Sequence, residues 1–252
     1  LENSGYDFPP KNFVVNLAPA GFKKQGAYFD LPIAIAILQA TGQVPPPEQP
    51  VPMVGELALD GRVKSVQGVI SMSISLLRAG YYSIIVPHEN RYEASAIEEV
   101  EVYPVGDIQG ALRAMFRESE PFQEKRTQAG GGFAGIDFGD VRGQESAKRA
   151  IEIAAAGRHN ILLYGPPGSG KTMLSRCVPT ILPPLTREQS IVTTMIHSAG
   201  GALGEHCGLI TVPPFRTPHH TASDAALVGG GRVPSVGEIS LAHNGVLYLD
   251  EF

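Results

Sequence analysis

The residues of this chain best suited to chemistry lie in the stretch 165–172, which has the spacing Gly-x-x-x-x-Gly-Lys-Thr. Glycines at this spacing let consecutive backbone N–H groups turn toward a polyphosphate. Lys171 can then reach the outer phosphates, and the hydroxyl of Thr172 can ligate Mg²⁺. The pattern predicts a phosphate-binding loop, whose candidate ligand-binding residues are Gly165, Pro166, Pro167, Gly168, Ser169, Gly170, Lys171 and Thr172.

The sequence on either side of the loop favours this interpretation. The apolar run 160–164 reads as a buried parallel strand, and a helical run begins at the end of the loop. Strand, loop and helix in this order are the context that the motif requires. The alternative is a glycine-rich turn between a strand and a helix in which Gly-Lys-Thr occurs by chance.

A second candidate segment lies at 245–251, where an apolar strand-like run ends in Asp250 and Glu251. This is a Walker B pattern. At the carboxyl edge of a sheet beside the loop, Asp250 would hold Mg²⁺ through its water shell, and Glu251 would orient or deprotonate an attacking water. Many strands end in a solvated acidic turn, so this pattern alone is weak evidence for a metal site. It becomes strong evidence when the same chain also has a phosphate-binding loop. Together they predict Lys171, Asp250 and Glu251 as catalytic residues and Thr172 and Asp250 as metal ligands.

Composition sets the class of protein. The chain has 252 residues, 43% of them hydrophobic, a net charge of −5 and two cysteines, Cys177 and Cys207. This length favours two domains. The negative net charge gives no indication that the chain binds nucleic acid. Two cysteines are too few for a disulfide framework. No stretch approaches the roughly 20 apolar residues that span a bilayer. We expect a cytoplasmic protein without a membrane partner.

Strand-like and helix-like patterns alternate over residues 1–116, which predicts an α/β domain. Asp60-Gly61 between two strand-like runs predicts a hairpin, and Asp30 and Asp107 are expected to cap helices. The expected strands are 13–17, 53–59, 62–66, 82–86 and 100–105; the expected helices are 31–40, 69–78 and one that follows Asp107.

The chain changes character at 117–132, where charges, glutamine and a triple glycine show no periodicity. We expect an interdomain linker there. A second domain then spans 133–252, with a helix over 147–154 that Gly157 closes, followed by the strand, the phosphate loop and the next helix. This is the order that a P-loop sheet uses.

Several of these segments resemble a known family. Val141-Arg142-Gly143-Gln144 resembles the adenine-side segment of AAA+ ATPases. The stretch Pro214 to Ser223, with its Pro-His-His-Thr-Ala-Ser, and the stretches 229–231 and 236–245 look very like the magnesium-chelatase-like AAA+ proteins of the YifB/ComM type. In the first half, 16–20, 29–34 and 54–61 resemble that family's N-terminal domain.

The resemblance implies an α/β fold with an N-terminal Lon-protease-like, ribosomal S5 domain 2-like domain, followed by a truncated P-loop AAA+ domain. It also implies ATP and Mg²⁺ as cofactors, with Val141 and Gln144 on the adenine side. The complete protein is expected to be an ATPase that forms a hexameric ring and acts on DNA by branch migration or unwinding in natural transformation.

Three other functions stay open: a chelatase motor that inserts Mg²⁺ into porphyrin, a protein-remodelling ATPase, and a non-catalytic scaffold. The family continues beyond the acidic pair with a sensor residue, an arginine finger and a helical lid. We therefore expect this chain by itself to bind ATP weakly and to hydrolyse it little.

The resemblance to Lon raises the question of peptidase chemistry, which in Lon-like enzymes needs a Ser-Lys dyad. The serine position falls near Asp30 and the lysine position near Ile70. Lys64, Ser65 and Ser71 lie nearby in sequence, but their spacing forms no dyad. We expect no peptidase activity.

The segment 199–218 is surplus to a minimal strand–helix–strand crossover, and its run 209–212 is β-like. The family resemblance implies an insert that reaches toward the centre of a ring, and a mobile surface loop is the alternative. Histidines and a cysteine fall close together here: His197, His206, Cys207, His219 and His220. Their spacing matches no established zinc pattern, so we expect no metal site among them.

Overall fold

The computed structural model describes residues 1–8, 12–17, 27–123, 137–204, 206–231 and 234–250. The chain divides into two compact units, the first formed by Leu1–Lys125 with Leu203–Gly208 and the second by Arg126–Ala202 with Leu209–Phe252. Both contain helices and short strands, so the fold is mixed α/β. Within the described ranges, no helix is long and apolar enough to cross a membrane.

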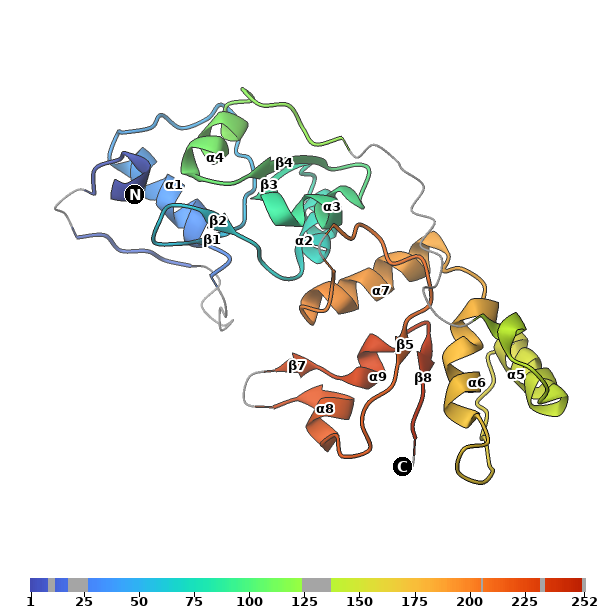
Figure 1. The fold of residues 1–252 in the computed structure, drawn as a ribbon. Coiled ribbons are helices and arrows are strands. Elements are labelled where there is room, and N and C mark those ends of the chain that lie inside the picture. Colours follow the sequence, from blue (N-terminus) through green and yellow to red (C-terminus); the bar gives the residue numbers. More distant parts are fainter. Residues whose placement is uncertain (9–11, 18–26, 124–136, 205, 232–233, 251–252) are drawn as a thin grey trace. The chain divides into compact units, whose positions relative to one another are not determined.

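The elements follow the chain in the order shown in Figure 1. The first unit contains η1 (Glu2–Ser4), α1 (Asp30–Ala40), β1 (Glu56–Leu57), β2 (Val63–Lys64), α2 (Val69–Arg78), β3 (Ser83–Pro87), η2 (His88–Asn90), α3 (Arg91–Ser95), β4 (Glu101–Val105) and α4 (Ile108–Met115). The second contains η3 (Phe138–Asp140), α5 (Glu145–Gly157), α6 (Lys171–Cys177), η4 (Val178–Ile181), α7 (Arg187–Ala199), β5 (Phe215–Arg216), α8 (Asp224–Val228), β6 (Gly229–Gly230), β7 (Ser235–Val236), α9 (Glu238–Leu241) and β8 (Val246–Leu247).

The centre of the first unit is the parallel pair of β3 and β4, in register from Ser83 opposite Glu101 to Pro87 opposite Val105. Every residue of β3 is buried, as expected for a parallel strand covered on both faces. Helices α1 and α4 pack together and supply much of the surrounding core. Its fully buried members include Leu31, Leu38, Ile85, Ile108 and Ala111.

The structure confirms the three helices expected in this unit. The helices expected over 31–40 and 69–78 are α1 and α2, and α4 follows Asp107, whose carboxylate Oδ1 accepts a hydrogen bond from the N–H of Gly110 at 2.6 Å. Asp30, however, is not a helix cap. Phe29 holds the cap position, and Oδ2 of Asp30 accepts the N–H of Leu57 at 3.3 Å, because β1 lies beside the start of α1.

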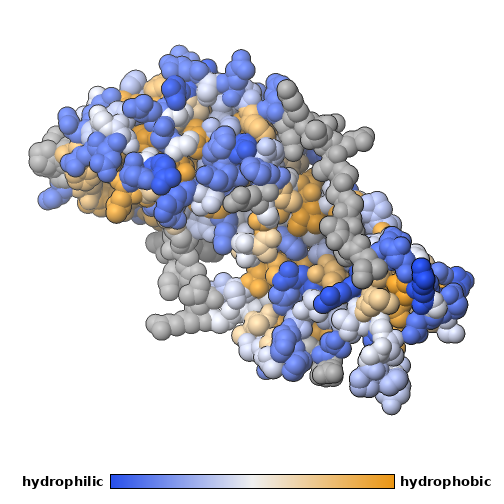
Figure 2. Space-filling view, viewed as in Figure 1, coloured by the Kyte–Doolittle hydropathy of each residue, from blue (hydrophilic) through white to orange (hydrophobic). Residues whose placement is uncertain are grey.

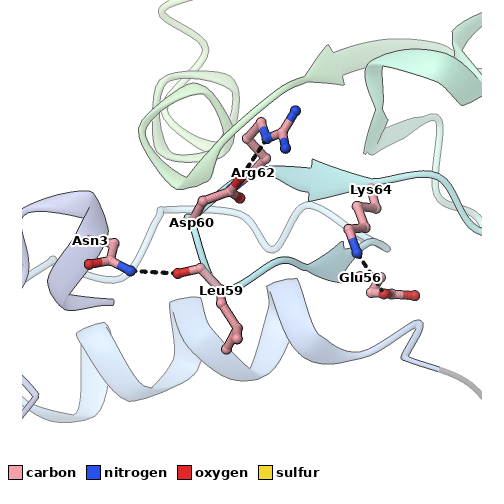
Figure 3. Close-up of polar contacts among 6 residues, drawn as sticks. All are labelled: Asn3, Glu56, Leu59, Asp60, Arg62 and Lys64. Carbon is pink, nitrogen blue, oxygen red and sulfur yellow. Dashed lines mark hydrogen bonds and ion pairs between the residues drawn. The ribbon is translucent and has the colours of Figure 1, made fainter.

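The expected hairpin at Asp60-Gly61 is also present, with β1 and β2 paired antiparallel. Gly61 has φ 88°, which explains why glycine suits this turn. Figure 3 shows the polar contacts around it: Arg62 Nε lies 2.7 Å from Asp60 Oδ2, and the side-chain amide of Asn3 donates to the carbonyl of Leu59 at 2.5 Å. The turn is therefore stabilised by a contact between its own residues and by a hydrogen bond from η1.

One expectation for the first part of the chain is wrong. Residues 13–17 form no strand, and Val14 is 94% exposed, so no neighbouring element in the described part covers its side chain. Part of the expected linker 117–132 contacts the first unit. Arg117 forms an ion pair with Glu101 at 2.9 Å, and the N–H of Phe122 donates to the carbonyl of Val102 at 2.7 Å. The residues 117–122 thus pack on the first unit, while 124–132 lie outside the described residues.

The second unit is built around helices and the short parallel pair β5–β8. Its core cluster consists of Phe138, Val141, Ile151, Leu174 and Cys177, drawn from η3, α5 and α6 and the segments beside them. Cys177 is fully buried, as an inert core cysteine should be.

The strand expected over 160–164 is absent from the described part of this unit, and the β-like run 209–212 forms none either. Leu162 and Tyr164 are 90% and 99% exposed. An apolar run becomes a strand only where a neighbour takes up its N–H and C=O groups, and in the described part of the unit β8 pairs with β5 instead. The β-like run 209–212 likewise bonds to other elements: the N–H of Ile210 donates to the hydroxyl of Thr194, and the carbonyl of Thr211 accepts the N–H of Leu185.

Candidate functional site

The glycine-rich loop leads directly into α6, which begins at Lys171. Gly168 and Gly170 have φ of 76° and 85°, in the left-handed region that side chains with a Cβ rarely adopt. These two glycines turn the chain from the run 160–164 into the helix. The first turn of α6 thus presents its backbone N–H groups toward the loop, as anion binding at a helix N-terminus requires.

The side chain of Lys171 folds back over the loop. Its ammonium donates to the carbonyl oxygens of Gly165 at 2.9 Å and of Pro166 at 3.0 Å. These two hydrogen bonds fix the orientation of both carbonyl groups toward the lysine. The tip of the loop, Pro166 to Gly168, is exposed. The loop projects below α6 at the lower right of Figure 1, and the same part of Figure 2 has the pale colour of residues that are neither strongly hydrophobic nor strongly hydrophilic.

The second candidate segment lies against this loop. The hydroxyl of Thr172 donates to Oδ2 of Asp250 at 3.2 Å, although the two residues are 78 positions apart. The hydroxyl of Tyr248 lies 3.4 Å from the same Thr172 oxygen. The structure therefore brings Lys171, Thr172 and Asp250 to one place. Glu251 lies outside the described residues.

Asp250 is positioned by the pairing of β8 with β5. The N–H of Val246 donates to the carbonyl of Pro214, and the N–H of Tyr248 to the carbonyl of Arg216, both at 2.8 Å. The two backbones come so close that a Cβ on Gly245 would overlap the carbonyl oxygen of Pro214. Only glycine fits at this position, and the strand it begins carries Tyr248 and Asp250 to the loop.

An ion pair anchors the end of β5. The guanidinium of Arg216 donates two hydrogen bonds to the carboxylate of Glu238, at 2.5 and 2.6 Å. The two side chains are 34% and 23% exposed. The hydrogen bonds from Arg216, opposed by partial burial, hold the pKa of Glu238 below its ordinary value, with a smaller contribution from His197. The bidentate geometry fixes β5 to α9, and β5 in turn positions Tyr248.

The two residues expected on the adenine side have different surroundings. Val141 is 2% exposed and packs in the core cluster, so its side chain serves the fold. Gln144 is exposed, and its side-chain amide donates to the carbonyl oxygen of Ser169, within the phosphate loop, at 2.9 Å. Neither the Gln144 contact nor the Tyr248 contact was expected from the sequence. The position of Tyr248 two residues before Asp250, hence on the same side of an extended chain, was the available signal for the second.

The oxygens of Thr172 and Asp250 suit a hard divalent cation. Neighbouring ligands of an octahedral Mg²⁺ with bonds of about 2.0–2.1 Å lie about 3 Å apart, and the separation of the two oxygens is 3.2 Å. Both atoms could thus share one cation at adjacent positions. The other ligands would be phosphate and water oxygens.

The histidines 197–220 do not gather around a common point. His197 is buried and its Nε2 donates to the carbonyl of Leu241 at 2.8 Å, whereas His219 and His220 stack on each other with ring centroids 4.3 Å apart. In the ranges that the structure describes, no three His, Cys, Asp or Glu side chains lie close enough together to hold a metal ion.

The positions that correspond to a Lon-type dyad carry no such chemistry. Asp30 accepts a backbone N–H, and Ile70 is fully buried at the start of α2. Lys64 instead faces Glu56 at 3.6 Å (Figure 3).

Comparison with known proteins adds independent information. The family described as "Magnesium chelatase, subunit ChlI" matches residues 137–252, and "Subunit ChlI of Mg-chelatase" matches residues 1–90. The chain is 44% identical over 256 residues to the protein YifB of Salmonella typhimurium, covering 99% of this chain and 49% of that protein. It is 41% identical over 258 residues to the competence protein ComM of Haemophilus influenzae, covering 100% of this chain and 50% of that protein.

A more distant similarity concerns the Lon protease of Azospirillum brasilense, 31% identical over 85 residues, which are 31% of this chain and 10% of that protease. The chain spans about half the length of the YifB and ComM relatives that it matches. The two family matches cover separate parts of the chain, and YifB and ComM proteins are 41–44% identical to it over 99–100% of its length. This chain therefore belongs to the magnesium-chelatase-like AAA+ family of the YifB/ComM type.

Proposed function

We propose that this chain binds ATP with Mg²⁺ and forms the nucleotide-binding part of an AAA+ ATPase. The observation that carries the proposal is the contact between Thr172 and Asp250, at 3.2 Å across 78 positions of sequence. If Gly-Lys-Thr occurred in a surface turn by chance, an acidic residue that follows a distant strand would not be expected to form a hydrogen bond with the threonine. Membership of an AAA+ family supports the same function.

Each residue of the proposed site has a role that follows from its chemistry. The N–H groups of the loop 165–170 would surround the phosphates, and Lys171 would exchange its two carbonyl partners for phosphate oxygens. Thr172 and Asp250 would hold Mg²⁺, which supplies charge neutralisation to the phosphates when bound. Glu251 would orient or deprotonate the attacking water.

Binding of MgATP by the chain tests the proposal. Lys171→Ala removes the cation that faces the phosphates and should weaken MgATP binding at least tenfold in calorimetric titration, and Asp250→Asn should weaken the dependence of binding on Mg²⁺. Lys64→Ala, which removes an exposed lysine of the first unit, is the control and should bind as the parent chain does. Equal affinity of Lys171→Ala and Lys64→Ala would contradict the proposal.

We further propose two domains for the fold: a Lon-like, ribosomal S5 domain 2-like domain over 1–116 and a P-loop domain over 133–252, joined through the linker 117–132, of which 117–122 packs on the first unit. The short similarity to Lon protease supports the first. For the complete protein, we propose a cytoplasmic hexameric ring that couples ATP hydrolysis to DNA remodelling, because a 41% identical relative is a competence protein.

ATPase activity of the complete protein, measured with and without DNA across salt concentrations, tests the DNA assignment. Counterion release gives DNA binding a steep salt dependence, so stimulation should fall sharply as salt rises. Stimulation by an unfolded protein, or by a porphyrin and its chelatase partners, with none by DNA would instead favour one of the other two motors.

A further inference from the structure

The contact of Gln144 with the phosphate loop has a geometry of its own. Gln144 precedes α5 and has φ 61° and ψ 32°, a left-handed conformation that directly follows the positive φ of Gly143. Its side chain makes no hydrogen bond to the N-terminus of α5. It points away instead, and its amide Nε2 donates to the carbonyl oxygen of Ser169 at 2.9 Å. The backbone turn thus directs this side chain to a loop 25 positions away.

The bonded carbonyl belongs to the peptide unit between Ser169 and Gly170. A trans peptide is planar and its C=O and N–H point in opposite directions. Holding the carbonyl of Ser169 on Gln144 therefore turns the N–H of Gly170 the other way. A loop that binds phosphate needs its N–H groups inward and its carbonyl oxygens outward, since a carbonyl oxygen near a phosphate is repelled.

The carbonyls at the other end of the loop have a different partner, the ammonium of Lys171, which would leave them when phosphate binds. Lys171 holds the carbonyls of Gly165 and Pro166. The neighbouring peptide, between Gly168 and Ser169, has its N–H on the carbonyl of Pro166 at 3.3 Å, which is long. In the described part of the chain, the Gln144 side chain is the hydrogen-bond partner that holds the carbonyl of the Ser169–Gly170 peptide.

We infer that Gln144 is a positioning residue of the phosphate loop, which acts on the triphosphate part of the ligand through the Ser169 peptide rather than on the base. The inference rests on the proposed nucleotide binding. It replaces the adenine-side role expected from the sequence with a role in orienting the N–H groups.

Two ligands separate these roles: MgATP and inorganic magnesium tripolyphosphate, which has the phosphates without the base. Gln144→Met keeps the length of the side chain and removes the donor. Loss of one neutral hydrogen bond corresponds to about a fivefold change in an equilibrium constant. Gln144→Met should therefore weaken the binding of both ligands by about the same factor, near fivefold. It should leave the preference for ATP over GTP unchanged. Gln109→Met, an exposed glutamine on α4, should alter neither ligand.

Gln144→Asn is a second variant, because asparagine tolerates the left-handed conformation while its amide is too short to reach Ser169. It should reproduce the effect of Gln144→Met with unfolding unchanged. The inference is overturned if either variant binds tripolyphosphate as the parent chain does, or if only MgATP is weakened and the preference for ATP over GTP changes. If the parent chain binds neither ligand, it is the proposed nucleotide binding that fails.

Discussion

The ion pair between Arg216 and Glu238 should stabilise the second unit by more than a surface pair does. Two hydrogen bonds of 2.5 and 2.6 Å join the side chains, which are 34% and 23% exposed. Two unit charges 4 Å apart attract by about 4 kcal/mol at an effective dielectric constant of about 20. Desolvation and lost side-chain entropy offset much of this. We expect a net coupling of about 1–2 kcal/mol, against about 0.2–1 kcal/mol for exposed pairs.

A double-mutant cycle measures this coupling. Arg216→Met, Glu238→Gln and the double variant are compared with the parent chain by urea unfolding at neutral pH, followed by a signal from the second unit. The matched control is a cycle on Arg149 and Glu152, which lie 2.9 Å apart in α5 and are 73% and 47% exposed. Because that pair is more exposed and has one hydrogen bond, its coupling should not exceed about 0.5 kcal/mol.

The coupling should also depend on pH in one direction. The pKa of Glu238 is lowered in the folded chain, chiefly by the hydrogen bonds from Arg216. A lowered pKa contributes stability above the unfolded value, about 4.3 for glutamate, and loses it as pH falls through the folded value. The coupling should therefore be constant from pH 6 to 8 and shrink below about pH 4. A coupling no larger than that of Arg149 and Glu152, or one unchanged in acid, would refute the reasoning.

Three further outcomes follow from other contacts. Tyr248→Phe keeps the ring stacked on β5 but removes the hydroxyl near Thr172, so MgATP binding should need about two- to fivefold more Mg²⁺ with unfolding unchanged, the contact being long. Asn90→Leu leaves both backbone groups of Val66 without the buried amide that now pairs with them, which should destabilise the first unit by about 2–4 kcal/mol in urea unfolding. Gly245→Ala forces β5 and β8 apart and should abolish Mg²⁺-dependent binding while circular dichroism still shows the helices.

Local patterns were sufficient where an element is stabilised by its own residues. The helices α1, α2, α4 and α5 and the hairpin at Gly61 follow from apolar periodicity, a capping aspartate and a turn glycine. The strands were predicted less well. The runs 13–17 and 160–164 have strand-like composition but form no strand in the described part of the chain, because a strand depends on a neighbouring strand for its ladder of hydrogen bonds.

The candidate site shows the same division. The sequence alone identified the loop 165–172 and Asp250 as a possible phosphate and metal site, because glycine spacing, a lysine, a hydroxyl and a carboxylate are chemical requirements that a linear pattern can display. Only the tertiary structure showed the hydrogen bonds from the hydroxyl of Thr172 to Asp250 and from the amide of Gln144 to Ser169. The same holds for the ion pair between Arg216 and Glu238. These contacts join residues that are far apart in the chain, and their distances are set by how helices and strands pack, which no local pattern encodes.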